Sequence, residues 1–146
     1  MTLLATSVVL LLAASAAENT PAIVQAPDSP VQLGHAKIFN IVAGEPAVLL
    51  YSATNLTDQD LEEFTIIAYV FDEQGTLKTR QTAPGRRTLE KRSTKYSTIV
   101  LDAAAVTATS RIVFGVNQAL PAGSEKWWHA ELDDAAKAAV KRNPEP

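Results

Sequence analysis

The sequence predicts a mainly β protein, an antiparallel β-sandwich of six or seven short strands with an N-terminal signal helix and a C-terminal α-helix. The main observation is the run of apolar, aromatic and β-branched residues at 64–71, which leads into a turn from Asp72 to Gly75. Shorter runs of similar composition recur between turn residues at the spacing typical of sandwiches. The last part of the chain instead has apolar residues at helical spacing.

The first 17 residues of this 146-residue chain have the composition of a signal peptide. They contain no charged side chain, include the apolar run 8–14, and end in Ser15, Ala16 and Ala17, which suits cleavage after Ala16 or Ala17. A membrane anchor is the alternative, but a spanning helix needs about 20 apolar residues and this run is shorter. We therefore expect a periplasmic or secreted protein with no stable membrane span after signal cleavage.

The remaining length fits one domain. Residues 18–30 are rich in proline, which predicts an extended, mobile leader. The sandwich domain is expected over residues 31–120, with its first two strands at 35–41 and 47–53.

The connection at residues 54–63 is rich in carboxylates. Four of them could hold calcium, because hard cations prefer several oxygen ligands at short range; they are Asp58, Asp60, Glu62 and Glu63. Their spacing lacks the glycine and the distal glutamate of an EF-hand loop. A solvated loop between the sheets is the preferred interpretation, and no metal is expected.

Residues 64–71 are predicted to form a central strand. Alternate side chains of a strand point to opposite faces, and here both sets are largely apolar. Such a strand is expected to have neighbours on both edges and cover over both faces. Asp72 and Gly75 take the first and fourth positions of a type I turn, so residues 76–82 should return antiparallel.

Three later segments complete the predicted sandwich. Pro84 and Gly85 occupy the centre of a predicted type II turn. Residues 96–101 form a strand whose inward face is ambiguous, because both alternating sets fit. The last strand, 111–119, has Gly115 on its second face, so that face should be poorly filled or approached by another element. The regular spacing of strands and turns is that of an immunoglobulin-like sandwich.

Residues 124–143 predict a C-terminal helix that runs from Glu125 to about Arg142. Its apolar stripe begins at Trp128 and is mostly alanine, so the helix should dock on the sandwich through Trp128 or remain partly mobile. In a helix Trp127 and Trp128 point about 100° apart, so one of them should pack inward and the other should be exposed.

The composition excludes several classes of function. The absence of cysteine excludes disulfides, thiolate metal sites and cysteine nucleophiles. A formal net charge of −3 gives no indication of a nucleic-acid partner. The two histidines, His35 and His129, lie in no recognisable catalytic or zinc motif. We expect a protein that is not an enzyme and binds no cofactor, and a hydrolase stays as a third hypothesis.

The candidate binding surface combines basic and aromatic residues. Residues 80–95 contain one acid, Glu90, and six basic residues, which are Arg80, Arg86, Arg87, Lys91, Arg92 and Lys95. Such a patch can contact anionic glycans, lipid head groups or the acidic face of a partner, or it can keep strand edges from pairing with other chains. Trp127 and Trp128 can stack on sugars or anchor a partner, or one of them can simply dock the helix.

The block Ala68-Tyr69-Val70-Phe71-Asp72, followed by Gly75, resembles the F-x-L-Y-D signature of small bacterial exported β-sandwich domains, the FxLYD domains. Ala68, Val70 and Phe71 replace the phenylalanine, leucine and tyrosine of the signature. Only the aspartate, Asp72, is unchanged. The resemblance extends in outline over residues 31–120. It implies an immunoglobulin-like fold in an exported protein, and it brings no catalytic residue and no common activity.

The sequence therefore predicts a non-catalytic exported interaction or structural module of the periplasm or cell surface, whose partner is another envelope or extracellular protein. The alternative is glycan or anionic-polymer binding through the Trp127 and Trp128 region together with the basic patch at 80–95.

Overall fold

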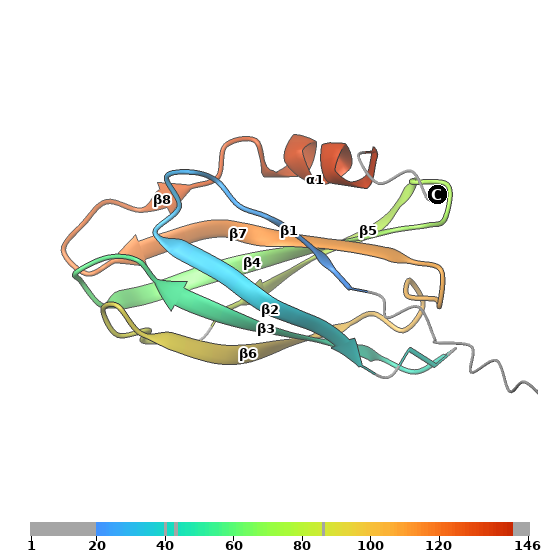
Figure 1. Ribbon diagram of the computed structural model, residues 1–146, viewed down its shortest axis with the longest axis horizontal. Helices are drawn as coiled ribbons and strands as arrows, with labels where there is room; N and C mark the ends of the chain where they lie inside the picture. The colour runs from blue at the N-terminus through green and yellow to red at the C-terminus, as the bar shows by residue number, and fades with distance from the viewer. Residues whose placement is uncertain (1–19, 40, 43, 86, 142–146) are drawn as a thin grey trace, which may run out of the picture.

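The computed structural model describes residues 20–39, 41–42, 44–85 and 87–141, and these form eight strands and one helix in two sheets. The strands are β1 (Ala22–Val24), β2 (Val31–Phe39), β3 (Ala47–Asn55), β4 (Leu61–Phe71), β5 (Leu77–Pro84), β6 (Thr94–Leu101), β7 (Arg111–Pro121) and β8 (Trp127–Trp128), and the helix is α1 (Leu132–Lys141). The larger sheet has the order β1-β7-β4-β5 with β8 also paired to β7, and the smaller has the order β2-β3-β6. Figure 1 shows α1 along the larger sheet, on the side away from β3 and β6. The prediction of a mainly β protein with a C-terminal helix is confirmed.

The two sheets share one apolar core. From the larger sheet it receives alternate residues of β4, among them Phe64 and Ile66, and from the smaller sheet it receives Leu49 and Tyr51 of β3. The rings of Tyr51 and Phe114, which lies on β7, pack across the sheets with centroids 5.8 Å apart. Burial of this surface away from water is the main force that holds the sheets together.

The opposite face of β4 is covered by α1. Ile67, Tyr69 and Phe71 belong to a second apolar cluster, together with Val113 of β7 and residues of the helix. β4 also has β5 and β7 as neighbours on its two edges. The prediction of a central strand covered on both faces is therefore confirmed, and α1 supplies the second cover.

Helix α1 docks through Leu132, Ala136 and Val140, which repeat every four residues and so lie on one face. This close approach depends on Gly115 of β7. A Cβ atom on that glycine would lie 2.7 Å from Leu132 Cδ1 and 2.9 Å from the backbone oxygen of Val24 in β1. The predicted approach of another element to the Gly115 face is confirmed, and that element is α1; β1, the neighbouring strand in the same sheet, further crowds this glycine.

The predicted turn between β4 and β5 is also confirmed. The Gly75 N–H donates to the Asp72 backbone oxygen at 3.0 Å, and the Asp72 N–H donates to the Thr76 backbone oxygen at 2.9 Å. Gly75 has a φ of 81°, the left-handed conformation that glycine adopts without strain. The Thr76 N–H also donates to the Asp72 side chain, and this bond lowers the pKa of that carboxyl group.

The segment predicted as a mobile leader is instead part of the fold. Ala22 to Val24 form β1, which pairs in parallel with β7 and makes the larger sheet mixed rather than purely antiparallel. Ser29 is buried, and its hydroxyl donates to the Val31 backbone oxygen at 2.8 Å. The prolines flank β1 and so remove no donor from it. The signal peptide predicted at residues 1–17 lies outside the described residues.

The predicted start of the C-terminal helix is wrong. Trp127 and Trp128 form β8, opposite Ala119 and Gln118 of β7, and the His129 N–H continues this pairing with a bond of 2.9 Å to β7. Tryptophan is enriched in strands, and two adjacent tryptophans can form one where a neighbouring strand offers unpaired backbone groups. The helix begins at Leu132, with acidic residues in its first turn as its dipole favours, and it docks without Trp128. Residues 142 and 143 lie outside the described residues.

Gly85 has a different role from the predicted one. The second centre position of a type II turn needs a positive φ, which Gly85 does not have. Instead β5 extends to Pro84, and the Gly85 N–H donates to the Phe64 backbone oxygen at 2.8 Å. A Cβ atom here would lie 2.2 Å from the Phe64 ring, so glycine is required for space.

The structure also determines which face of β6 points inward and where β2 begins. In β6, Ile99 and Leu101 point into the core and Tyr96 and Val100 are exposed, which resolves the ambiguity in the sequence. β2 begins at Val31 and not at His35 as predicted.

We expect Gly115→Ala to lower the free energy of unfolding by about 1–3 kcal/mol, because the added methyl group must displace Leu132 or the β1 backbone. Gly34→Ala is the matched control, since its Cβ would meet a movable side-chain atom, Ser52 Oγ, at 3.2 Å. Urea unfolding measures the loss, and hydrogen exchange of α1 should accelerate in Gly115→Ala alone. Equal losses in the two variants would contradict the role given to Gly115.

We expect Tyr51→Phe to stabilise the fold by about 1 kcal/mol, because the Tyr51 hydroxyl is buried without a hydrogen-bond partner among the described residues. Burial raises the pKa of this group, and the Ser97 hydroxyl opposes that rise although it makes no bond of ordinary geometry. Thermal unfolding provides the measurement. Tyr69→Phe is the opposite control, since it removes a hydroxyl that donates to Asp133 and should destabilise.

Candidate functional site

The structure separates Arg80 from the other members of the predicted basic patch that it places near β6. Arg80 lies on β5, where its guanidinium is 3.1 Å from the Asp133 carboxylate of α1 and 6.0 Å from the centre of the Tyr69 ring. Lys91 and Arg92 lie in the turn before β6, and Lys95 lies on β6 in the smaller sheet. Arg87 is exposed, and Arg86 lies outside the described residues.

Near the β6 turn, acidic groups accompany the basic residues. Arg92 Nε lies 2.9 Å from Asp58 Oδ1, and this hydrogen bond lowers the pKa of the Asp58 carboxyl group. Lys95 Nζ lies 2.7 Å from Glu90 Oε2 and likewise lowers the pKa of Glu90. Exposed pairs of this kind add little stability, but they reduce the local positive potential. The turn is therefore a mixed surface and not a continuous basic one.

Three of the four carboxylates considered for calcium have partners of their own. Asp58 pairs with Arg92, Asp60 accepts the Lys91 backbone N–H at 2.8 Å, and Glu63 pairs with Lys126 at 2.8 Å. Glu62 is exposed on β4. Within the described part of the chain, no three such side chains come together as metal ligands would.

A polar cluster around Asp133 fastens α1 to the larger sheet. The Tyr69 hydroxyl donates to Asp133 Oδ1, and Arg80 donates to Oδ2 of the same carboxylate. Burial raises the pKa of Tyr69 strongly, and the hydrogen bond to Asp133 and the charge of that carboxylate raise it further, while Arg80 opposes them. Arg80 thus has a structural partner, which the sequence did not indicate because the two residues lie far apart in it.

The two tryptophans take opposite orientations, as predicted, although a strand and not a helix is the cause. Trp127 packs against the core, and its Nε1 donates to Asp28 at 3.1 Å. Trp128 is 59% exposed, and Lys126 Nζ lies 5.6 Å from the centre of its ring. Side chains alternate across a strand, so inward packing of one indole presents the other to solvent.

A pocket of about 240 Å³ lies beside Trp128. Its wall brings together the tryptophan pair and hydrogen-bonding side chains, which include Asp28, His129 and Glu131. Asp28 carried no functional signal in the sequence, because it belongs to the segment predicted as a leader. Nothing in the sequence relates residue 28 to residue 127.

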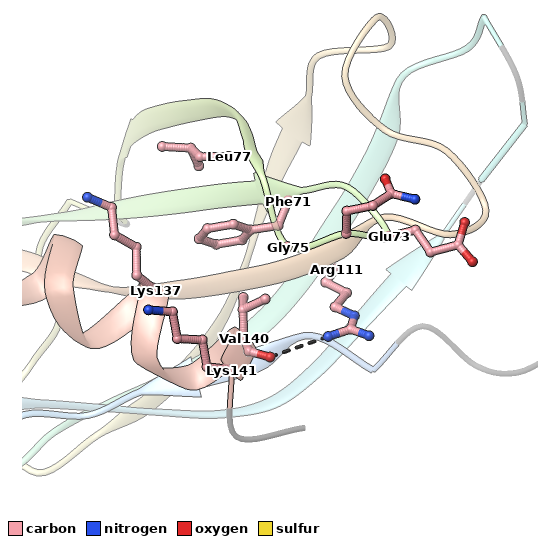
Figure 2. Close-up of a pocket in the computed structure, with 9 residues that line it drawn as sticks. Phe71, Glu73, Gly75, Leu77, Arg111, Lys137, Val140 and Lys141 are labelled. Atoms are coloured by element: carbon pink, nitrogen blue, oxygen red, sulfur yellow. Dashed lines mark hydrogen bonds between the residues drawn. The ribbon is translucent and has the colours of Figure 1, made fainter. Parts of the chain in front are cut away.

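A second pocket, of about 480 Å³, lies between the β4–β5 turn and the last turn of α1. Figure 2 shows Lys137 of the helix on the side of Phe71 and Leu77 and Lys141 beside Val140, and the Arg111 guanidinium donates to the Val140 backbone oxygen at 3.3 Å. These residues come from four separate elements. Nothing in the sequence indicates that these residues line one pocket.

The two histidines have aromatic neighbours. His35 lies at a bulge of β2 with a φ of 44°, and its ring centre is 6.5 Å from that of Tyr96. The His129 ring centre is 5.9 Å from that of Trp127. Across the described ranges, no side-chain hydrogen bond joins either imidazole to a serine or a carboxylate. No helix in those ranges has the length and hydropathy needed to cross a membrane.

We expect stability to decline as pH rises above about 10, in part through Tyr69. Folding raises the Tyr69 pKa, so its contribution is complete below the pKa of the unfolded state and is lost as pH rises through the folded pKa. Tyr69→Phe should be less stable than the wild type at about pH 8 and should decline less steeply toward about pH 11. Urea unfolding at each pH tests this, with Tyr96→Phe as the exposed control. Identical slopes for Tyr69→Phe and the wild type would refute it.

Comparison with known proteins gives no family assignment, since no family model and no curated protein matches the chain. Among solved structures, the X-ray structure of the Northeast Structural Genomics Consortium target SoR45 is similar at a TM-score of 0.46 and 12% identity, over 70% of this chain and 81% of that one. The β-glucosidase EmGH1 of Erythrobacter marinus is similar at a TM-score of 0.39 and 13% identity, over 68% of this chain. This chain matches 15% of the β-glucosidase. Both TM-scores are too low to carry an argument about fold or function.

Proposed function

We propose that this chain is a non-catalytic exported binding module of the periplasm or cell surface, built on an immunoglobulin-like sandwich. The observation that carries the proposal is the exposed indole of Trp128 on a fixed support. A large apolar side chain that is mostly exposed at a defined position is a recurrent feature of binding surfaces.

The support limits the entropic cost of binding. β8 pairs with β7, Trp127 is half-buried against the core, and Asp28 accepts the hydrogen bond of its indole. The backbone at Trp128 is thus fixed, before any partner binds, by the pairing of β8 with β7 and by the contacts of the adjacent Trp127. Preorganisation of this kind raises affinity, because less freedom is lost on association.

A protein partner from the envelope or the extracellular space is the preferred occupant. Tryptophan is among the residues most enriched in the energetic centres of protein interfaces. Lys126 lies over the ring, and its own ion pair is with Glu63, so the surface around the indole is polar and charged, as interface rims are.

Glycan binding through the same tryptophan is the second candidate, and the adjacent pocket favours it. Indole faces stack on sugar rings, and Asp28, His129 and Glu131 place hydrogen-bonding groups beside Trp128. The basic residues of the β6 turn are not included in this proposal, because Arg92 and Lys95 already pair with carboxylates.

The proposal of an immunoglobulin-like, FxLYD-type fold is based on β4 and the turn that follows it. Asp72, the unchanged residue of the FxLYD-like block, ends the central strand, and its backbone and side chain both bond within the turn. This position is consistent with a structural use of the signature aspartate. Membership of the FxLYD group and export by residues 1–17 stay proposals.

The test compares Trp128→Ala with Val100→Ala, which truncates a similarly exposed apolar residue on the smaller sheet. The two variants and the wild type are used to capture cross-linked proteins from the envelope fraction, and each is applied to a glycan array. We expect Trp128→Ala to reduce affinity for the captured partner by about 30-fold, as loss of an interface centre does, and Val100→Ala to have no effect. Equal unfolding curves would exclude a folding defect. Unchanged protein capture and unchanged glycan binding in Trp128→Ala would refute the proposal.

A further inference from the structure

We propose that the pocket between the β4–β5 turn and the end of α1 binds an amphipathic organic anion, a carboxylate or phosphate head joined to an acyl tail. Its volume of about 480 Å³ lies within the range of about 300–1,000 Å³ found for small-molecule sites. In Figure 1 this turn and the end of α1 lie at the opposite end of the molecule from β8. The site is therefore separate from the Trp128 surface.

The charge of the lining favours an anion. Arg111, Lys137 and Lys141 line the pocket against one acid, Glu73. Within the described residues, neither lysine has an ion-pair partner, whereas Lys78, Lys95 and Lys126 elsewhere each pair with a carboxylate. Lys137 and Lys141 are four residues apart on one helix face, where like charges repel. An anion between them would remove that repulsion.

The apolar part of the lining favours a tail. Phe71 and Val140 are buried at the pocket, and Leu77 keeps 37% of its surface exposed at the first position of β5. Figure 2 shows Phe71 and Leu77 on the side of Lys137, and Lys141 extends from the helix below them. A ligand with both a charged head and an apolar chain satisfies both parts of the lining, whereas an inorganic anion leaves Leu77 exposed.

The end of α1 sets where the head group lies. The last carbonyl groups of a helix carry partial negative charge, which opposes an anion on the helix axis. Arg111 donates to the Val140 oxygen and so partly neutralises this end. We therefore assign the head group to the Lys137 and Lys141 amines. Arg111 is a positioning residue that holds the helix end.

The test is an NMR titration of the isotope-labelled chain in a phosphate-free buffer, with each probe kept below its micelle-forming concentration. Decanoate and decyl phosphate should shift the amides of Gly75, Leu77 and Val140 saturably, and their relative affinity distinguishes a carboxylate from a phosphate head. Decanol lacks the charge and inorganic phosphate lacks the tail. We expect decanol to bind at least about tenfold more weakly than decanoate, and inorganic phosphate at least about tenfold more weakly than decyl phosphate.

The variants separate recognition from folding. Lys137→Gln/Lys141→Gln should weaken decanoate binding by about fivefold or more, while Lys91→Gln, an exposed lysine outside the pocket, should leave it unchanged. Trp128→Ala should also leave it unchanged, so failure here is distinct from failure of the proposed function. Decanol binding as tight as decanoate, inorganic phosphate binding as tight as decyl phosphate, no saturable shift, or full affinity in the double variant would each overturn the proposal.

Discussion

The packing of α1 on the outer face of the larger sheet, over β7 and against the outer side chains of β4, is the contact on which the rest of the structure depends. β4 is apolar on both faces, so without the helix it would present Ile67, Tyr69 and Phe71 to water. Gly115 of β7 leaves the space that Leu132 needs to approach the sheet closely, and the Asp133 cluster fixes the position of the helix along the sheet. The same packing places the end of α1 beside the β4–β5 turn and so creates the second pocket.

Local patterns in the sequence were sufficient for the features that depend on neighbouring residues. The two-faced run of β4 and the turn from Asp72 to Gly75 are determined by side-chain alternation and by a backbone conformation that suits glycine. The strand β3 was predicted for the same reason. In each case the residues that determine the structure are adjacent in the chain.

Features that depend on distant partners could not be predicted. β1 and β8 are very short, and each is a strand because β7 offers it backbone hydrogen bonds. The tryptophan pair matched a helical period as well as a strand, and only the pairing with Ala119 and Gln118 decides between them. Likewise the basic residues are close together in the sequence, but Arg80 pairs with Asp133 on the larger sheet and Arg92 pairs with Asp58 near the β6 turn.

The parallel pairing of β1 with β7 has a consequence for the order of folding. Ala22 is opposite Val113, so the first of the described strands pairs with one of the last. Until β7 is made, β1 has no partner in the larger sheet, and α1, which covers both, is made later still. Contacts between such distant segments form slowly. Among the described strands of the larger sheet, β1 therefore waits longest for its partner, and chaperones that recognise extended segments have that interval in which to bind it.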